Sequence, residues 1–169
     1  MKRNRFVLAA VVLLLLGGVW WWTGPRCALD GPPELTVSAG EGQTQVGFWS
    51  AQWASPTAAF NACGDVPTDP AARDYQPVVY VAEGAEELTL SYPVAPSHVT
   101  VFCTPDSGGE TLSLYDGSGK RELSIPLPED CRGIYEVSET WNTVPPATGS
   151  AQRGFLVVGE GERVGVLQQ

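Results

Sequence analysis

The sequence has one histidine and four cysteines, and these scarcities exclude several kinds of site. His98 has no second imidazole with which to share a metal ion, so a histidine-based metal centre is excluded. No C-x-x-C spacing occurs, which leaves neither a dithiol redox motif nor a zinc knuckle. Asn61 and Asn142 lack the hydroxyl residue two positions on that N-glycosylation needs. We expect no catalytic residue, no metal and no cofactor.

Positive charge is also scarce over most of the chain. Six basic and nineteen acidic residues follow Cys27, a formal charge of −13. Such a surface repels nucleic acid and anionic lipid, so nucleic acid is not an expected partner. The charge is explained most simply by the solubility of an exported domain, and binding of cations or basic partners is the alternative.

One long apolar run, from Phe6 to Trp22, organises the chain. Its seventeen residues carry no charge. Seventeen residues are at the short end of the helix length that spans a bilayer core of about 30 Å. Lys2, Arg3 and Arg5 precede the run and favour a cytoplasmic amino end. The residues that we assign to the anchor include Phe6, Leu14, Trp20, Trp21 and Trp22, with the three indoles at the outer headgroup layer.

The anchor divides the chain into four parts. We predict a cytoplasmic stub at 1–5, a transmembrane signal-anchor at 6–23, a stalk at 24–33 and an extracytoplasmic domain at 34–169 of a single-pass cell-membrane protein. Two alternatives lack their signatures. A cleaved signal peptide needs small residues before the cut, and a lipoprotein cysteine does not follow an arginine, as Cys27 does.

The exported part shows short apolar–polar alternation and no convincing helical period. Turn residues separate the runs. We predict a loop at 64–74 and a turn at 145–149. Many short strands with turn punctuation are typical of an antiparallel β-sandwich. The predicted strands lie at 35–37, 46–54, 58–63, 77–81, 88–92, 99–103, 112–114, 123–127, 135–141 and 155–158.

A local pattern sharpens the fold class. Asp130, Gly133 and Tyr135 resemble the tyrosine corner at the E–F turn of immunoglobulin-like domains. The resemblance makes 88–92 and 99–103 strands B and C, and it makes the strand around Leu123 strand E; strands F and G are then 135–141 and 155–158. We therefore predict an all-β, immunoglobulin-like antiparallel sandwich.

Two further motifs carry a resemblance to a group of proteins. Pro32–Val37 reads Pro-Pro-x-Leu-Thr-Val and leads to an aromatic hairpin, and Tyr135–Trp141 reads Tyr-Glu-Val-x-x-x-Trp. The chain resembles a loosely defined group of small, membrane-tethered, immunoglobulin-like surface proteins of Gram-positive bacteria. It departs from the group at Phe48, where a small residue is usual. The group implies a fold and a location, and no activity.

The aromatic residues Phe48, Trp49 and Trp53 have two interpretations. Large aromatics usually serve burial, which favours the core for the two tryptophans. Exposed, the three would form a partner surface for sugar rings or an apolar protein.

The four cysteines follow the anchor run, and an exported compartment permits disulfides. In an immunoglobulin-like strand order, Cys103 at the end of strand C lies near Cys131 in the E–F turn. We predict that these two pair, which leaves Cys27 for Cys63.

Three functions remain open. The first is a non-enzymatic binding or accessory module that contacts a protein or glycan at the cell envelope. The second is a hydrolase that uses turn carboxylates, and the third is a structural spacer. Turn chemistry explains the acidic residues better than a Ca²⁺ site, and His98 is better explained as a strand-end residue than as a base. The turn carboxylates are Asp106, Glu110, Asp116, Glu129 and Asp130.

Overall fold

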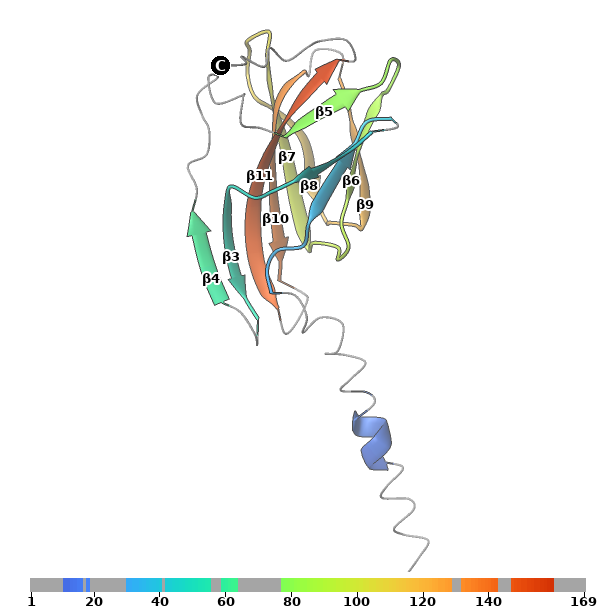
Figure 1. Ribbon diagram of the computed structural model, residues 1–169, viewed down its shortest axis with the longest axis vertical. Coiled ribbons are helices and arrows are strands. Elements are labelled where there is room, and N and C mark those ends of the chain that lie inside the picture. The colour runs from blue at the N-terminus through green and yellow to red at the C-terminus, as the bar shows by residue number, and fades with distance from the viewer. Residues whose placement is uncertain are drawn as a thin grey trace, which may run out of the picture.

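The structure, a computed structural model, describes residues 11–16, 18, 30–40, 42–55, 59–63, 77–128, 132–142 and 147–159. Within these residues the chain is all-β except for helical residues 11–16 and 18, which Figure 1 shows apart from the strands. No helix among them is long and apolar enough to cross a membrane. Most of the predicted anchor and stalk lies outside the described residues, so both stay predictions.

Eleven strands within the described residues form two sheets (Figure 1). The smaller sheet has the order β2-β1-β6-β9, and the larger has the order β4-β3-β11-β10-β7-β8 with β5 beside β11. The smaller sheet consists of β1 (Leu35–Ser38), β2 (Gln43–Val46), β6 (Glu87–Ser91) and β9 (Glu122–Pro126). The larger sheet consists of β3 (Ser50–Ala54), β4 (Ala59–Cys63), β5 (Val78–Val81), β7 (His98–Pro105), β8 (Leu112–Gly117), β10 (Gly133–Trp141) and β11 (Thr148–Gly159).

Period-two alternation explains why these segments are strands. In β10, Tyr135, Val137 and Trp141 point into the core, while Glu136 and Ser138 between them face outward. Residues of both sheets, such as Leu90 of β6 and Val101 of β7, belong to one apolar cluster. The core therefore lies between the two sheets, and the all-β prediction is confirmed.

The prediction of one strand over 46–54 is wrong. Val46 ends β2 in the smaller sheet, and Ser50 begins β3 in the larger one. The chain changes sheets through Gly47–Trp49, where the Trp49 amide donates to the Gln152 carbonyl at 2.7 Å. The segment Val46–Trp49 shows no apolar–polar alternation, so the crossing is not visible in the sequence.

The last strand is longer than the predicted 155–158. β11 begins at Thr148, inside the predicted turn at 145–149, and pairs with β10 from Gly149 to Val157. Its first half is polar and glycine-rich, so it lacks the apolar alternation of the other strands. β11 also pairs with β5 in parallel, so the expectation of purely antiparallel pairing is wrong at this place.

One cysteine can be placed in the core. Cys103 of β7 is fully buried and disulfide-bonded. Cys63 lies on β4, and the three strands β3, β11 and β10 separate it from β7. Four inter-strand spacings amount to about 19 Å, whereas the Cα atoms of a disulfide lie about 4.4–6.8 Å apart. Cys63 is therefore not the partner of Cys103, and the pairing with Cys131, which lies outside the described residues, stays a prediction.

Candidate functional site

The outer face of the larger sheet carries two rows of small polar side chains. Antiparallel register places side chains that are directly opposite each other on the same face. The first row crosses four strands and comprises Asn61, Gln52, Ser150 and Thr140. The second row comprises Ser50, Gln152 and Ser138.

These rows line a groove of about 510 Å³. The groove runs from β4 to β10, about 14 Å across three inter-strand spacings. The seven side chains that face it are four hydroxyls and three carboxamides, and all are uncharged. Glu139 also contributes to the lining, but its carboxylate is buried on the opposite face of β10. The volume lies within the range of ligand sites, about 300–1,000 Å³.

One hydrogen bond orders the middle of the groove. The Ser50 hydroxyl donates to Oε1 of Gln152 at 2.9 Å. With its oxygen engaged, the Gln152 carboxamide directs its NH₂ group, which carries two donors, away from Ser50. The two residues are 102 positions apart in the sequence, so the sheet register alone brings them together.

An indole lies beside the groove, further along β11 than Gln152. The Trp49 ring occupies the space above Gly154, where a Cβ atom would lie 1.6 Å from Cζ2 of the ring. Gly154 follows Gln152 by two residues on the same face, about 7 Å along the strand. Trp49 is half-buried, so the residue is not enclosed in the core. A glycine is required at 154, because a side chain there would displace the ring.

The other two aromatics of the predicted partner surface lie elsewhere. Trp53 is 3% exposed and packs edge-on against Trp141, with ring centroids 5.7 Å apart. It therefore belongs to the core and not to a surface. Phe48 is 40% exposed in the segment that joins β2 to β3.

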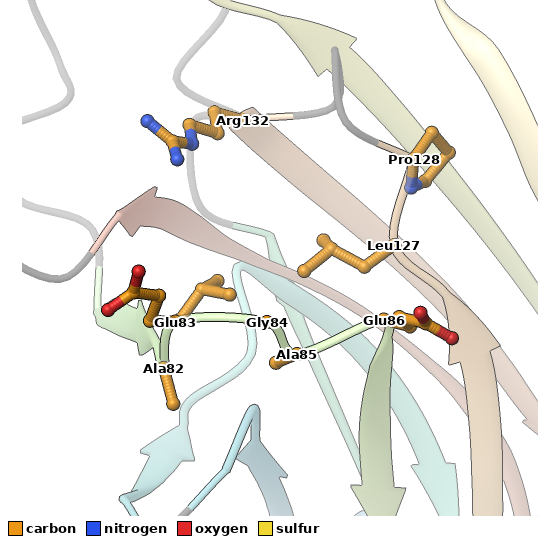
Figure 2. A pocket seen from close by; sticks show the side chains of 9 residues that line it. Ala82, Glu83, Gly84, Ala85, Glu86, Leu127, Pro128 and Arg132 are labelled. Carbon is orange, nitrogen blue, oxygen red and sulfur yellow. The ribbon is translucent and has the colours of Figure 1, made fainter.

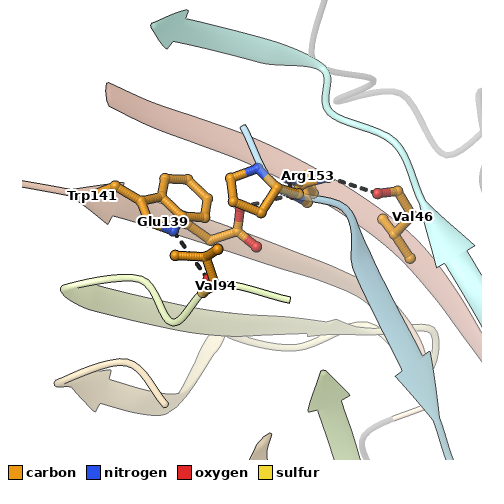
Figure 3. Close-up of polar contacts among 6 residues, drawn as sticks. Val46, Val94, Glu139, Trp141 and Arg153 are labelled. Carbon is orange, nitrogen blue, oxygen red and sulfur yellow. Dashed lines mark hydrogen bonds and ion pairs between the residues drawn. The ribbon is translucent and has the colours of Figure 1, made fainter. Parts of the chain in front are cut away.

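A buried ion pair lies beneath the groove (Figure 3). Nε of Arg153 donates to Oε2 of Glu139 at 2.7 Å, and both side chains are at most 2% exposed. The guanidinium also donates to the carbonyls of Val46 at 2.8 Å and of Pro33 at 2.5 Å. Arg153 thereby fastens the β1–β2 hairpin to the strand that carries Gln152.

Burial sets the protonation behaviour of this network. It raises the pKa of Glu139, and the Arg153 guanidinium opposes that shift. Burial also raises the pKa of Tyr92, and the neighbouring Glu139 carboxylate adds to the shift. Among the described residues, neither the Tyr92 hydroxyl nor Oε1 of Glu139 forms a hydrogen bond of standard geometry. The network is thus a polar part of the core, on the side of β10 away from the groove.

His98 lies at the far end of the first row. It opens β7, opposite Thr140, and its Nε2 lies 2.9 Å from Oδ1 of Asp116. Both side chains are at least half exposed. Asp116 is part of β8 and not of the predicted turn. In the described part of the chain, no three His, Cys, Asp or Glu side chains are placed to hold a metal ion.

A second cavity has a volume of about 660 Å³, and Figure 2 shows the side chains that line it. The turn between β5 and β6 forms one side, and Leu127, Pro128 and Arg132 form the other. Its charged side chains are Glu83, Glu86 and Arg132, and Arg132 lies over Gly159. The lining of this cavity therefore carries charges of both signs.

Comparison with known proteins found no matching family model, no similar curated protein and no similar solved structure. The resemblance based on Pro32–Val37 and Tyr135–Trp141 therefore stays a prediction. Trp49 is the one residue of the predicted partner surface that lies at the edge of the groove. The polar rows of the groove were not predicted. One sequence signal indicated an outward-facing row on a strand here: the residues at 150, 152 and 154 alternate with Ala151, Arg153 and Phe155.

Proposed function

We propose that this protein is a non-enzymatic binding module, held outside the cytoplasmic membrane by its N-terminal segment. The groove of the larger sheet is its binding face, and the partner is a component of the cell envelope. The observation that carries the proposal is the groove itself, an ordered, uncharged hollow on a domain whose exported sequence has a formal charge of −13.

The proposed fold is an immunoglobulin-like sandwich. Immunoglobulin domains place strands A, B and E in one sheet and C, F and G in the other. Here β1, β6 and β9 are neighbours in the smaller sheet, as A, B and E would be, and β7, β10 and β11 are neighbours in the larger sheet, as C, F and G would be. The strands β2, β3, β4 and β5 are then an insertion after the first strand, and β3 and β4 of this insertion supply one side of the groove.

The membrane location is supported by the helical residues 11–16. All six are Val or Leu, and they are 46–77% exposed, with Leu14 the most exposed. Six adjacent apolar side chains are costly in water and favourable in a bilayer, at about 0.8 kcal/mol per buried CH₂.

Protease accessibility tests the location. A protease added to intact cells, or to spheroplasts where a wall is present, should digest the domain while a cytoplasmic marker survives. Intact mass should retain residues from Lys2 onward. A protected domain beside a protected marker shows that the orientation is wrong, and a mature N-terminus after Gly24 shows that the anchor is cleaved.

Site-specific photo-cross-linking in intact cells tests the binding face. A benzophenone side chain at Ser138, in the groove, should form an adduct that is absent when the same group replaces Ser124. Ser124 is exposed on the outer face of the smaller sheet, on β9, and is the matched control. Equal adduct formation at both positions, or none at either, would contradict a binding role for the groove.

A further inference from the structure

The chemistry of the groove limits which ligands it can hold. Each hydroxyl and carboxamide that faces it can both donate and accept a hydrogen bond. The hydroxyls of a sugar do the same, so every group on either side can find a partner. Ionic ligands are bound in proteins by charge-assisted hydrogen bonds, and the side chains facing the groove offer no charge to an anion or a cation.

A protein partner fits this surface less well. Protein interfaces depend on buried aromatic, methionine or arginine anchors in desolvated pockets. The described residues that line the groove include no large apolar side chain. The surrounding acidic domain also repels anionic polymers, so among glycans an uncharged one is favoured.

Trp49 adds what a polar groove alone lacks. The CH face of a sugar ring is apolar and packs against aromatic rings, whose π face is partly negative. The Trp49 ring is fixed above Gly154, next to Gln152, so a chain of sugars that crosses the polar rows reaches it. The Ser50–Gln152 hydrogen bond fixes the central donor before a ligand arrives, which lowers the entropic cost of binding.

We infer that the groove binds a short neutral oligosaccharide, with Gln152 donating hydrogen bonds to its hydroxyls and Trp49 packing against a sugar ring. This inference rests on the proposed function, because it names the ligand of the same binding face.

The test uses the full chain in a zwitterionic detergent that contains no sugar. The chain is applied to an array of short neutral and N-acetylated oligosaccharides, and the Kd of the best ligand is measured by calorimetry. Gln152→Ala should raise that Kd about three- to tenfold, the effect of one lost hydrogen bond. Trp49→Leu should raise it by a similar factor, while Ser124→Ala should leave it unchanged.

Two array results would overturn the inference. One is binding to none of the oligosaccharides, and the other is a Kd that Gln152→Ala and Trp49→Leu do not change. Thermal unfolding of each variant shows whether it is folded, and the exposed Gln152 should be replaceable without loss of stability.

The adduct formed at Ser138 separates this inference from the proposed function. An adduct that contains carbohydrate supports both. An adduct that contains only protein overturns the oligosaccharide inference and leaves the binding module standing. No adduct beyond that at Ser124 overturns both.

Discussion

Replacing Arg153 by methionine should be among the most destabilising single changes in this domain. The substitution leaves the Glu139 carboxyl buried without its partner, and the group must then remain charged in the core or take up a proton. Breaking a buried ion pair in this way costs about 3–5 kcal/mol. The carbonyls of Val46 and Pro33 lose their donors as well, at about 1–3 kcal/mol for each group that stays dry.

We expect a total loss of about 5 kcal/mol of unfolding free energy, and at least about 3 kcal/mol if water reaches the two carbonyls. Domains have a total stability of about 5–15 kcal/mol, so the variant should be partly unfolded at room temperature. Urea unfolding at pH 7, followed by near-ultraviolet circular dichroism, measures this loss. A chain that begins at Asp30 is suitable, because the apolar core cluster begins at Leu35.

The double variant Glu139→Leu/Arg153→Met is the control for the ion pair. With both charges removed, the two unpaired carbonyls remain the main defect, and the loss should fall to about 2 kcal/mol. The reasoning is refuted if Arg153→Met alone loses less than about 1 kcal/mol, the range of ordinary surface changes. It is also refuted if the double variant loses the sum of the two single variants, because the pair would then have no coupling.

Three further predictions follow from the same contacts. Burial raises the pKa of Glu139 above 4.5, so the folded state holds this proton more tightly than the unfolded state. The unfolding free energy of the protein, compared with that of the Glu139→Gln variant, should therefore fall as the pH rises above 4.5. A difference between the two proteins that does not change with pH in urea titrations would contradict this. Gly154→Ala should displace the Trp49 ring and cost about 1–3 kcal/mol, and an unchanged Tm would show that the ring lies elsewhere. Non-reducing peptide mapping should recover Cys103 linked to Cys131, and a free Cys103 thiol would contradict the structure.

Much of the fold follows from side-chain alternation. The strands β6, β7, β9 and β10 bury every second residue, so their existence and facing are visible in the sequence. The break between β2 and β3 was not predictable in this way, because Val46–Trp49 lacks apolar–polar alternation at the crossing. The strands β2 and β3 belong to different sheets, and only the pairing partners of Val46 and Ser50 reveal that the chain changes sheets between them.

The first half of β11 escaped prediction for another reason. Arg153 is charged and yet fully buried, so it interrupts the apolar pattern of an inward-facing row. Its carbonyl partners lie 107 and 120 residues away in the sequence, and no local signal connects them. A buried charge is stable only where such partners converge, and this depends on the completed fold.

The groove was hidden for a related reason. Serine, threonine and glutamine on a strand are typical of an ordinary solvent-facing row. Only the register of β3, β11 and β10 gathers them into one hollow. Trp49 was predictable as a conspicuous aromatic, whereas its position over Gly154 was not.

Hydroxyl-radical footprinting of the chain in its own cells tests most directly whether the groove is an occupied binding face. Trp49 at the groove edge should oxidise more slowly in intact cells than in the purified protein. Tyr80 of β5 serves as the control, because it is 55% exposed and pairs with Val158, about 20 Å along β11 from Gln152. Its oxidation rate should be the same in both samples. Equal rate ratios for Trp49 and Tyr80 would contradict a bound partner in the groove.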